Sequence, residues 1–256
     1  GVDMDMVSDA FVGTLKKSLT EGKVTEEAIN AACRRILEAK YKLGLFDNPY
    51  KYCDVKRAKK QIFTKEHRAV ARKIASESLV LLKNEGNVLP LAKKGTIAVV
   101  GPLADSRSNM PGTWSVAAVL KNATSLAEGL KAVAGGKAEI LTAKGCNLMS
   151  DAEYEKRATM FGRSLHRDNR SDKELLDEAL AVAAKSDVIV AALGESSEMS
   201  GESSCRTNLE MTDTQRILLQ ELLKTGKPVV LVLFTGRPLV LNWEQVLPSV
   251  MYCLVM

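Results

Sequence analysis

The sequence predicts an α/β protein in which a mostly parallel sheet lies between two layers of helices. From residue 96 onward, short apolar segments alternate with amphipathic segments of helical period. The apolar segments are continuous and do not alternate with polar residues, as a strand with one solvent-exposed face would. Continuous apolar runs are typical of parallel strands buried on both faces. Residues 6–45 differ, because they contain helical patterns and no strand. The chain is therefore predicted to combine an α/β sandwich with helices that belong to another domain.

The first helical segment shows apolar residues at helical spacing, including Phe11, Leu15 and Leu19, and Gly22 is predicted to end it. A second helix is expected to begin after Thr25, a residue suited to an N-cap, and to end near Gly44. These helices have no strand of their own. Their apolar faces need a partner.

Residues 51–95 are expected to form a linker and a connecting helix. The charged run at 56–60 is most simply an exposed linker, and the spacing of apolar residues predicts a helix over 65–83. The first strand of the sandwich is predicted at 96–100, where it ends at Gly101 and Pro102.

The rest of the chain repeats this pattern. Strands are predicted at 138–142, 187–193 and 228–234, helices at 125–134, 172–185 and 212–224, and a charged insertion at 150–170. The chain closes on another apolar run, 249–256, which suggests an unfinished sheet. An uncompleted apolar edge favours pairing with another chain, so a homo-oligomer is a further expectation.

Composition excludes several functional classes. The 256 residues carry a net charge of +5, are 46% hydrophobic and have a mean hydropathy of −0.06. No apolar stretch has the roughly 18–20 residues of a membrane span, and the mild basic excess comes with no nucleic-acid motif. The five cysteines are scattered, which predicts free thiols, with one disulfide as the alternative, and no zinc site. Dinucleotide and P-loop motifs are absent, so no cofactor or metal is expected.

The polar segment that follows the strand at 187–193 is the main candidate for chemistry. It holds three carboxylates, Glu195, Glu198 and Glu202, and ends near Arg206. Open α/β sheets bind ligands beyond the carboxyl ends of their strands. Glu195 could bind a ligand or serve only as an acceptor that braces the loop. Arg206 could pair with a loop carboxylate or with a hydroxyl of a ligand.

A second loop, 105–115, follows the strand at 96–100 and contains Trp114 next to Pro111 and Gly112. An exposed indole offers a flat apolar face to a ligand, whereas a buried one packs in a core. Both alternatives remain open at this point.

Five segments in the same order resemble glycoside hydrolase family 3, and look most like its bacterial periplasmic β-glucosidases. They are GVDMDM at 1–6, YKLGLF at 41–46, ASESLVLLKN at 75–84, IAVVGPLAD at 97–105 and TGRPL at 235–239. The resemblance implies a retaining β-glucosidase acting on terminal non-reducing β-D-glucosyl residues of a β-glucoside or oligosaccharide. It also implies a periplasmic or secreted location for the intact protein.

The resemblance implies three parts: the last helices of a truncated (β/α)8-type barrel at 1–50, a linker with its connecting helix at 51–95, and an α/β sandwich at 96–256. Glu202, in Ser200-Gly201-Glu202-Ser203, matches the general acid/base, while Trp114, Glu195 and Arg206 are expected to bind substrate. The nucleophilic Asp of the family lies in a Ser-Asp-Trp-like or Ser-Asp-His-like motif that these residues lack. We therefore expect it upstream of residue 1, on the missing barrel domain, and expect the isolated chain to be inactive.

Two hypotheses from other classes stay open. The same loops would serve a non-catalytic carbohydrate-binding or interaction module. A flavodoxin-like regulator would require a bound nucleotide or flavin.

Overall fold

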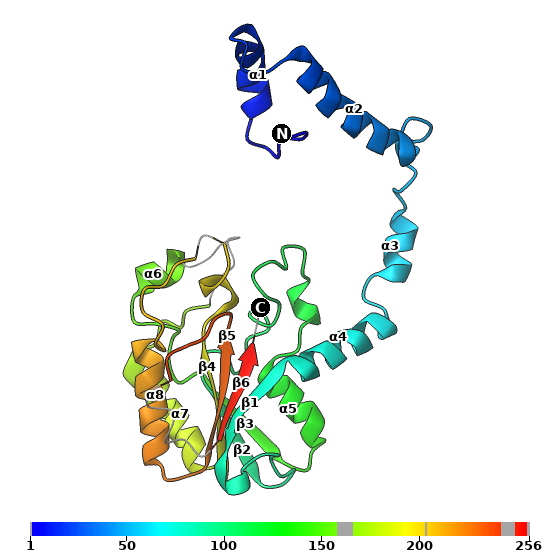
Figure 1. The fold of residues 1–256 in the computed structure, drawn as a ribbon. Coiled ribbons are helices and arrows are strands. Elements are labelled where there is room, and N and C mark those ends of the chain that lie inside the picture. The colour runs from blue at the N-terminus through cyan, green and yellow to red at the C-terminus, as the bar shows by residue number, and fades with distance from the viewer. Residues whose placement is uncertain (1, 158–165, 203, 242–248, 255–256) are drawn as a thin grey trace. The chain divides into compact units, whose positions relative to one another are not determined.

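A computed structural model describes residues 2–157, 166–202, 204–241 and 249–254 of the chain (Figure 1). The chain divides into two compact units, residues 1–71 and residues 72–256. Each unit is described by itself below.

The first unit is helical, as predicted for residues 6–45. It contains α1 (Ala10–Thr20), α2 (Glu26–Lys42) and α3 (Val55–Gln61), and α4 (Lys65–Ser78) begins in it and crosses the boundary. The predicted N-cap is confirmed, because the Thr25 hydroxyl accepts the N–H of Ala28 at 3.2 Å. Gly22 follows the end of α1 with φ +68°, which suits a glycine. The linker predicted at 56–60 is wrong, because this run forms the helix α3, whose N-cap is Asp54, which accepts the N–H of Lys56 at 2.9 Å.

Within the described part of the chain, no residue of α1 or α2 is buried. The exposed apolar side chains include Phe11, Leu19, Leu37 and Tyr41. Amphipathic helices normally bury such a stripe against another element. This unit therefore presents apolar helix faces that its own residues do not cover.

The second unit is built on one mostly parallel sheet, which confirms the predicted fold class (Figure 1). Its strands are β1 (Leu79–Asn84), β2 (Thr96–Val100), β3 (Glu139–Ala143), β4 (Val188–Gly194), β5 (Val229–Thr235) and β6 (Ser249–Leu254). They lie side by side in the order β1-β6-β5-β4-β2-β3. All neighbouring pairs are parallel except β1 with β6.

The helix predicted over 65–83 is wrong in its last turn and a half. The helix ends at Ser78, and residues 79–84 form the edge strand β1, in register with β6 from Leu79 opposite Cys253 to Asn84 opposite Ser249. A continuous apolar run such as 79–82 fits a strand as well as a helix. The antiparallel partner, which lies far along the chain, decides between them.

Two apolar cores lie on opposite faces of the sheet. On one face, α7 (Asp172–Ala184) and α8 (Asp213–Lys224) pack on alternate residues of β2, β4 and β5, such as Val100, Ala191 and Leu231. On the other face, α5 (Leu126–Ala134) and residues 88–91 pack near the intervening residues, such as Val99 and Val190. Burial of both faces explains why these strands read as continuous apolar runs.

A short helix, α6 (Ala152–Arg157), lies in the charged insertion predicted at 150–170. Among the described residues, no helix combines the length and apolarity of a membrane span. Cys33, Cys53, Cys146 and Cys205 are free thiols. Burial raises the pKa of the Cys146 thiol, so this cysteine is an apolar core residue rather than a nucleophile.

Candidate active site

The strand order reverses between β2 and β4. The chain moves from β2 outward to β3, and then returns past β2 to β4, so the parallel strands lie in the order β3-β2-β4-β5-β6. Loops that leave the carboxyl ends of strands at such a switch point diverge and leave room for a ligand. The loops after β2 and β4 are the two that the sequence singled out, 105–115 and 194–206.

Each of these loops leaves its strand through a glycine with positive φ. Gly101 ends β2 with φ +131°, and Gly194 ends β4 with φ +127°. A Cβ added to Gly101 would lie 2.2 Å from the carbonyl oxygen of Ala192, and one added to Gly194 would lie 2.0 Å from that of Phe234. Any larger residue would collide with backbone, so glycine is required at both exits.

Gln215 of α8, which is fully buried, holds the exit from β4. Its Oε1 accepts the N–H of Gly194 at 2.7 Å, and its Nε2 donates to the carbonyl oxygen of Gly194 at 2.9 Å and to that of Leu148 at 2.9 Å. A buried amide with its polar atoms satisfied fixes the backbone around it. The sequence analysis missed this residue, because nothing in the local sequence relates it to Gly194.

The two loops are bonded to each other. The N–H of Ser197 donates to Oδ1 of buried Asn109 at 3.0 Å, and the hydroxyl of Thr113 lies within hydrogen-bonding distance of the carbonyl oxygens of Ser197 and Ser200, the latter at 2.7 Å. A Cβ added to Gly201 would lie 3.1 Å from Cγ2 of Thr113. Thr113 and Gly201, the residues directly before Trp114 and Glu202, therefore touch.

The predicted sugar platform and acid/base residues are both on the surface. Trp114 is 60% exposed, so the alternative of a core indole does not hold for the described structure. Glu202 is also exposed. Glu195 and Glu198, by contrast, are each only 2% exposed. The three carboxylates of the loop thus divide into two buried groups and one that a solute can reach.

Glu195 is held in a buried ion cluster. Its Oε1 accepts from Nη1 of Arg206 at 2.7 Å and lies 3.3 Å from Nε of Arg237, while the hydroxyl of Thr235 lies 3.2 Å from its Oε2. Of the two alternatives for Arg206, the structure shows the loop carboxylate. Arg237 was quoted in the sequence only as part of a motif, and its contact with Glu195 depends on the pairing of β4 with β5.

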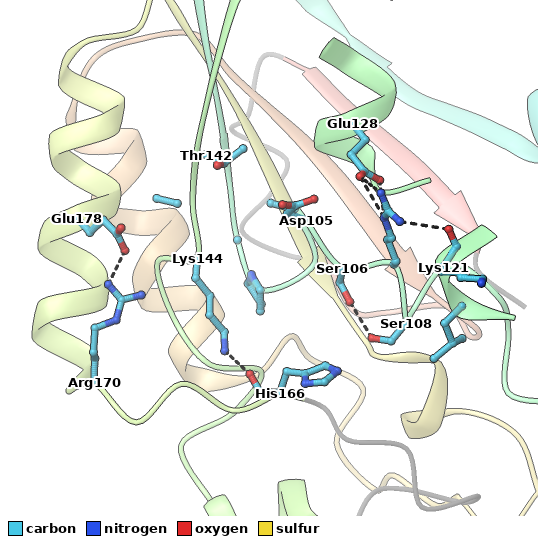
Figure 2. Close-up of a pocket in the computed structure, with 16 residues that line it drawn as sticks. Asp105, Ser106, Ser108, Lys121, Glu128, Thr142, Lys144, His166, Arg170 and Glu178 are labelled. Atoms are coloured by element: carbon cyan, nitrogen blue, oxygen red, sulfur yellow. Dashed lines mark hydrogen bonds and ion pairs between the residues drawn. The ribbon is translucent and has the colours of Figure 1, made fainter. Parts of the chain in front are cut away.

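A polar cleft of about 700 Å³ opens beside the carboxyl ends of β2 and β3 (Figure 2). Figure 2 shows Asp105, Lys144 and His166 along it, with Glu128 on one side and Arg170 paired to Glu178 on the other. Arg107, which also lines the cleft, pairs with Glu128. The hydrogen bonds from Arg107 lower the pKa of Glu128 to about 2, and burial lowers the pKa of Lys144.

None of the predicted site residues lines this cleft. Its lining includes Asp105, Ser106, Arg107 and Ser108 from the start of the loop after β2, but not Trp114, Glu195, Glu202 or Arg206. The ends of its arginines are engaged by carboxylates, which leaves little charge to recruit an ion. In the described part of the chain, no group of three His, Cys, Asp or Glu side chains is placed to hold a metal.

The family model of the glycosyl hydrolase family 3 C-terminal domain matches residues 79–255, more than half of the chain. The chain belongs to glycosyl hydrolase family 3. A periplasmic β-glucosidase of Salmonella typhimurium is 42% identical over 248 residues, which are 96% of this chain and 32% of the relative. A β-xylosidase of Formosa agariphila is 34% identical, over 98% of this chain and 34% of the relative.

Solved structures of family 3 agree with this assignment. The crystal structure of a β-glucosidase from Listeria innocua in complex with isofagomine superimposes with a TM-score of 0.80 at 32% identity, over 100% of this chain and 32% of that one. The chain thus spans about a third of the length of these family 3 relatives. The resemblance stated from the sequence is confirmed, while the roles of Glu202, Trp114, Glu195 and Arg206 stay predictions.

Proposed function

We propose that this chain supplies the acid/base half of a retaining β-glucosidase, with Glu202 as general acid/base and Trp114 as a platform for the sugar. The contact between Thr113 and Gly201 carries the proposal, because it sets these two side chains on adjoining backbone positions at the switch point of the sheet. Both side chains are open to solvent, as groups that meet a soluble glycoside must be.

The chemistry needs two carboxyl groups. In a retaining glycosidase one carboxylate attacks the anomeric carbon, while the other protonates the leaving oxygen and later takes a proton from the attacking water. Glu202 would perform both proton transfers. The nucleophilic carboxylate would come from a barrel domain outside residues 1–256, so this chain alone would not turn over a glycoside.

The helical unit supports the barrel as a partner. We propose that residues 1–50 are the last helices of the barrel, that 51–95 connect the two domains, and that 96–256 belong to the sandwich. The exposed apolar faces of α1 and α2 are suited to cover a barrel supplied by the rest of the intact protein. Homology to a periplasmic β-glucosidase supports a periplasmic or secreted location for that protein.

Complementation tests the assignment. The chain, combined with the barrel segment of the Salmonella relative, is expected to release nitrophenol from p-nitrophenyl β-glucoside, which neither part does alone. Glu202→Ala is expected to lower the rate by about 10²-fold or more, the usual contribution of general acid–base catalysis. Azide should restore part of it, because azide attacks the glycosyl-enzyme without needing a general base.

Glu221→Ala on α8 is the matched control, since Glu221 pairs with Lys224 on the helix surface and lies outside the loop. Its rate should equal that of the parent. Full activity in Glu202→Ala would remove the acid/base role from Glu202. Saturable glucoside binding by the chain alone, with no turnover after complementation, would favour the carbohydrate-binding module.

A further inference from the structure

The loop that carries Glu202 is fixed by side chains that lie outside it. It begins at Glu195, turns through Gly201 and returns to Arg206, and its described residues, 195–202 and 204–206, have no regular structure apart from one short turn of 3₁₀ helix at residues 197–199. Without external contacts, a polar loop of this kind would sample many conformations. What holds its backbone therefore decides where Glu202 points.

One buried carboxylate joins the two ends of the loop. The Glu195 side chain, 1% exposed, binds Arg206 at 2.7 Å, so the first and last residues of the loop are tied together. Arg206 is only 11% exposed, and its Nη2 also donates to the carbonyl oxygen of Glu210 at 2.7 Å. Breaking a charged pair withdrawn from water in this way costs free energy, because it leaves the other charge buried and unpaired.

Arg237 extends this cluster to the middle of the loop. It lies just after β5, with Nε 3.3 Å from Oε1 of Glu195, and its Nη2 donates to the carbonyl oxygen of Met199 at 2.7 Å. The next carbonyl, that of Ser200, lies 2.7 Å from the Thr113 hydroxyl. The two peptide groups that precede Gly201 are thus held by two different segments, the residues just after β5 and the loop after β2.

We propose that Arg237 is a positioning residue for Glu202, acting through Glu195 and the carbonyl of Met199. This inference rests on the proposed role of Glu202 as acid/base. Arg237 bridges the anchored base of the loop and the peptide group three residues before Glu202. Its planar guanidinium combines an ion-pair contact with Glu195 and a hydrogen bond to the Met199 carbonyl, two contacts that the single ammonium of a lysine does not make at once.

The dependence on leaving group distinguishes positioning from a general loss of folded enzyme. A misplaced general acid slows the departure of phenol, which needs a proton, far more than that of 2,4-dinitrophenol, which leaves as an anion. A lower fraction of folded enzyme slows both substrates equally. The ratio of the two kcat/KM values is therefore independent of how much protein is active.

In the complemented enzyme, Arg237→Met is expected to raise the ratio of dinitrophenyl to phenyl β-glucoside kcat/KM by about tenfold, part of the 10²–10⁴ range of general acid catalysis. Arg237→Lys should raise it by a smaller factor. Arg216→Met is the matched control, because it removes another arginine–glutamate pair, Arg216 with Glu210 at 2.9 Å, from a half-exposed site on α8. Its ratio should not change.

Glu202→Ala in the same assay separates the two proposals. If the ratio is unchanged in Glu202→Ala, the acid/base assignment itself fails. If the ratio rises in Glu202→Ala but stays at the parent value in Arg237→Met, or rises equally in Arg216→Met, the positioning role is overturned.

Hydrogen exchange on the 256-residue chain covers the case in which Arg237→Met does not assemble with the barrel. The amides of residues 200–202 are expected to exchange about tenfold faster in Arg237→Lys, while those of β4 and β5 keep their protection. Unchanged exchange at 200–202 would contradict the proposal as directly as the kinetic result.

Discussion

Glu195 and Glu202 lie on the same loop, yet one is buried against two arginines and the other is exposed. Local sequence does not separate them, because both follow a glycine and both precede a serine. The difference comes from Arg237, which the pairing of β5 with β4 brings beside Glu195. A role for each carboxylate therefore depends on contacts that are distant in the chain.

Gly194 offers a sharp test of the loop exit. Gly194→Ala places a Cβ 2.0 Å from the carbonyl oxygen of Phe234 at φ +127°, so strain and overpacking should lower the free energy of unfolding by about 2–4 kcal/mol. Urea denaturation followed by circular dichroism measures this loss.

Gly129→Ala is the matched control for Gly194. Gly129 lies inside α5, has no unusual φ, and has open space where a Cβ would stand. The substitution should raise the free energy of unfolding by about 0.5–1 kcal/mol, because alanine favours the helix. Equal effects at the two glycines would contradict the structural requirement at Gly194.

Residues whose role is local were predictable from sequence. Thr25 as an N-cap and Gly22 after a helix follow from chemistry within a few residues. Gln215, Asn109 and Arg237 were not predictable in this way, because each acts on a segment far away in the chain. Trp114 and Glu202 could be selected as candidates because each lies just beyond a strand that could itself be recognised.

At the scale of elements, most helices and strands lie within a residue or two of their predicted bounds, because both faces of the sheet are buried and the apolar pattern is strong. Two elements are exceptions: α3, which forms where an exposed linker was predicted, and the end of α4. The pattern of residues 79–82 leaves helix and strand equally open, and β6 resolves it. The predicted end of an element is wrong where a strand far along the chain determines its structure.

The start of α5 carries a testable electrostatic feature. Ser125 and Glu128 form a capping box, and Arg107 binds the same Glu128 carboxylate. In Arg107→Met, the titration midpoint of Glu128 is expected to rise from about 2 toward its ordinary 4.5, because the largest stabilising contact of the ionised form is lost. Carbon-detected NMR of the side-chain carboxyl measures the midpoint.

The same shift gives the sign of a pH effect. Because the pKa of Glu128 is lower in the folded state, its contribution to stability is fully present above about pH 4.5 and is lost as the pH falls toward 2. Glu174, in the capping box of α7, is the control, since its pKa is lowered by Ser171 and it has no contact with Arg107. If the titration midpoint of Glu128 were unchanged in Arg107→Met, the ion pair would not be the cause of its low pKa.

At the scale of the whole molecule, the edge strand β1 exposes a run of four apolar side chains. Leu79, Val80, Leu81 and Leu82 are each 44–55% exposed, on a strand whose described partner is β6 alone. Consecutive residues of a strand point to opposite faces, so both faces of β1 are apolar. Open apolar edges pair readily with other chains.

We therefore expect the 256-residue chain to self-associate at micromolar concentrations in analytical ultracentrifugation. Leu81→Lys should weaken the association by about tenfold or more, because an edge lysine opposes strand pairing. Ile217→Lys on α8 is the control, being an equally exposed apolar residue away from the edge. A chain that stays monomeric, or one that both lysines affect equally, would contradict association through β1.

The cluster around Glu195 bears on attempts to exchange loops between family 3 enzymes. Residues 194–206 reach their positions through Gln215 of α8, Arg237 beyond β5, and Asn109 and Thr113 of the neighbouring loop. A graft of the loop alone would carry Arg206 along with Glu195 but would leave Arg237 and the other outside contacts behind. To keep the conformation of the loop, an exchange would therefore have to include all four segments together.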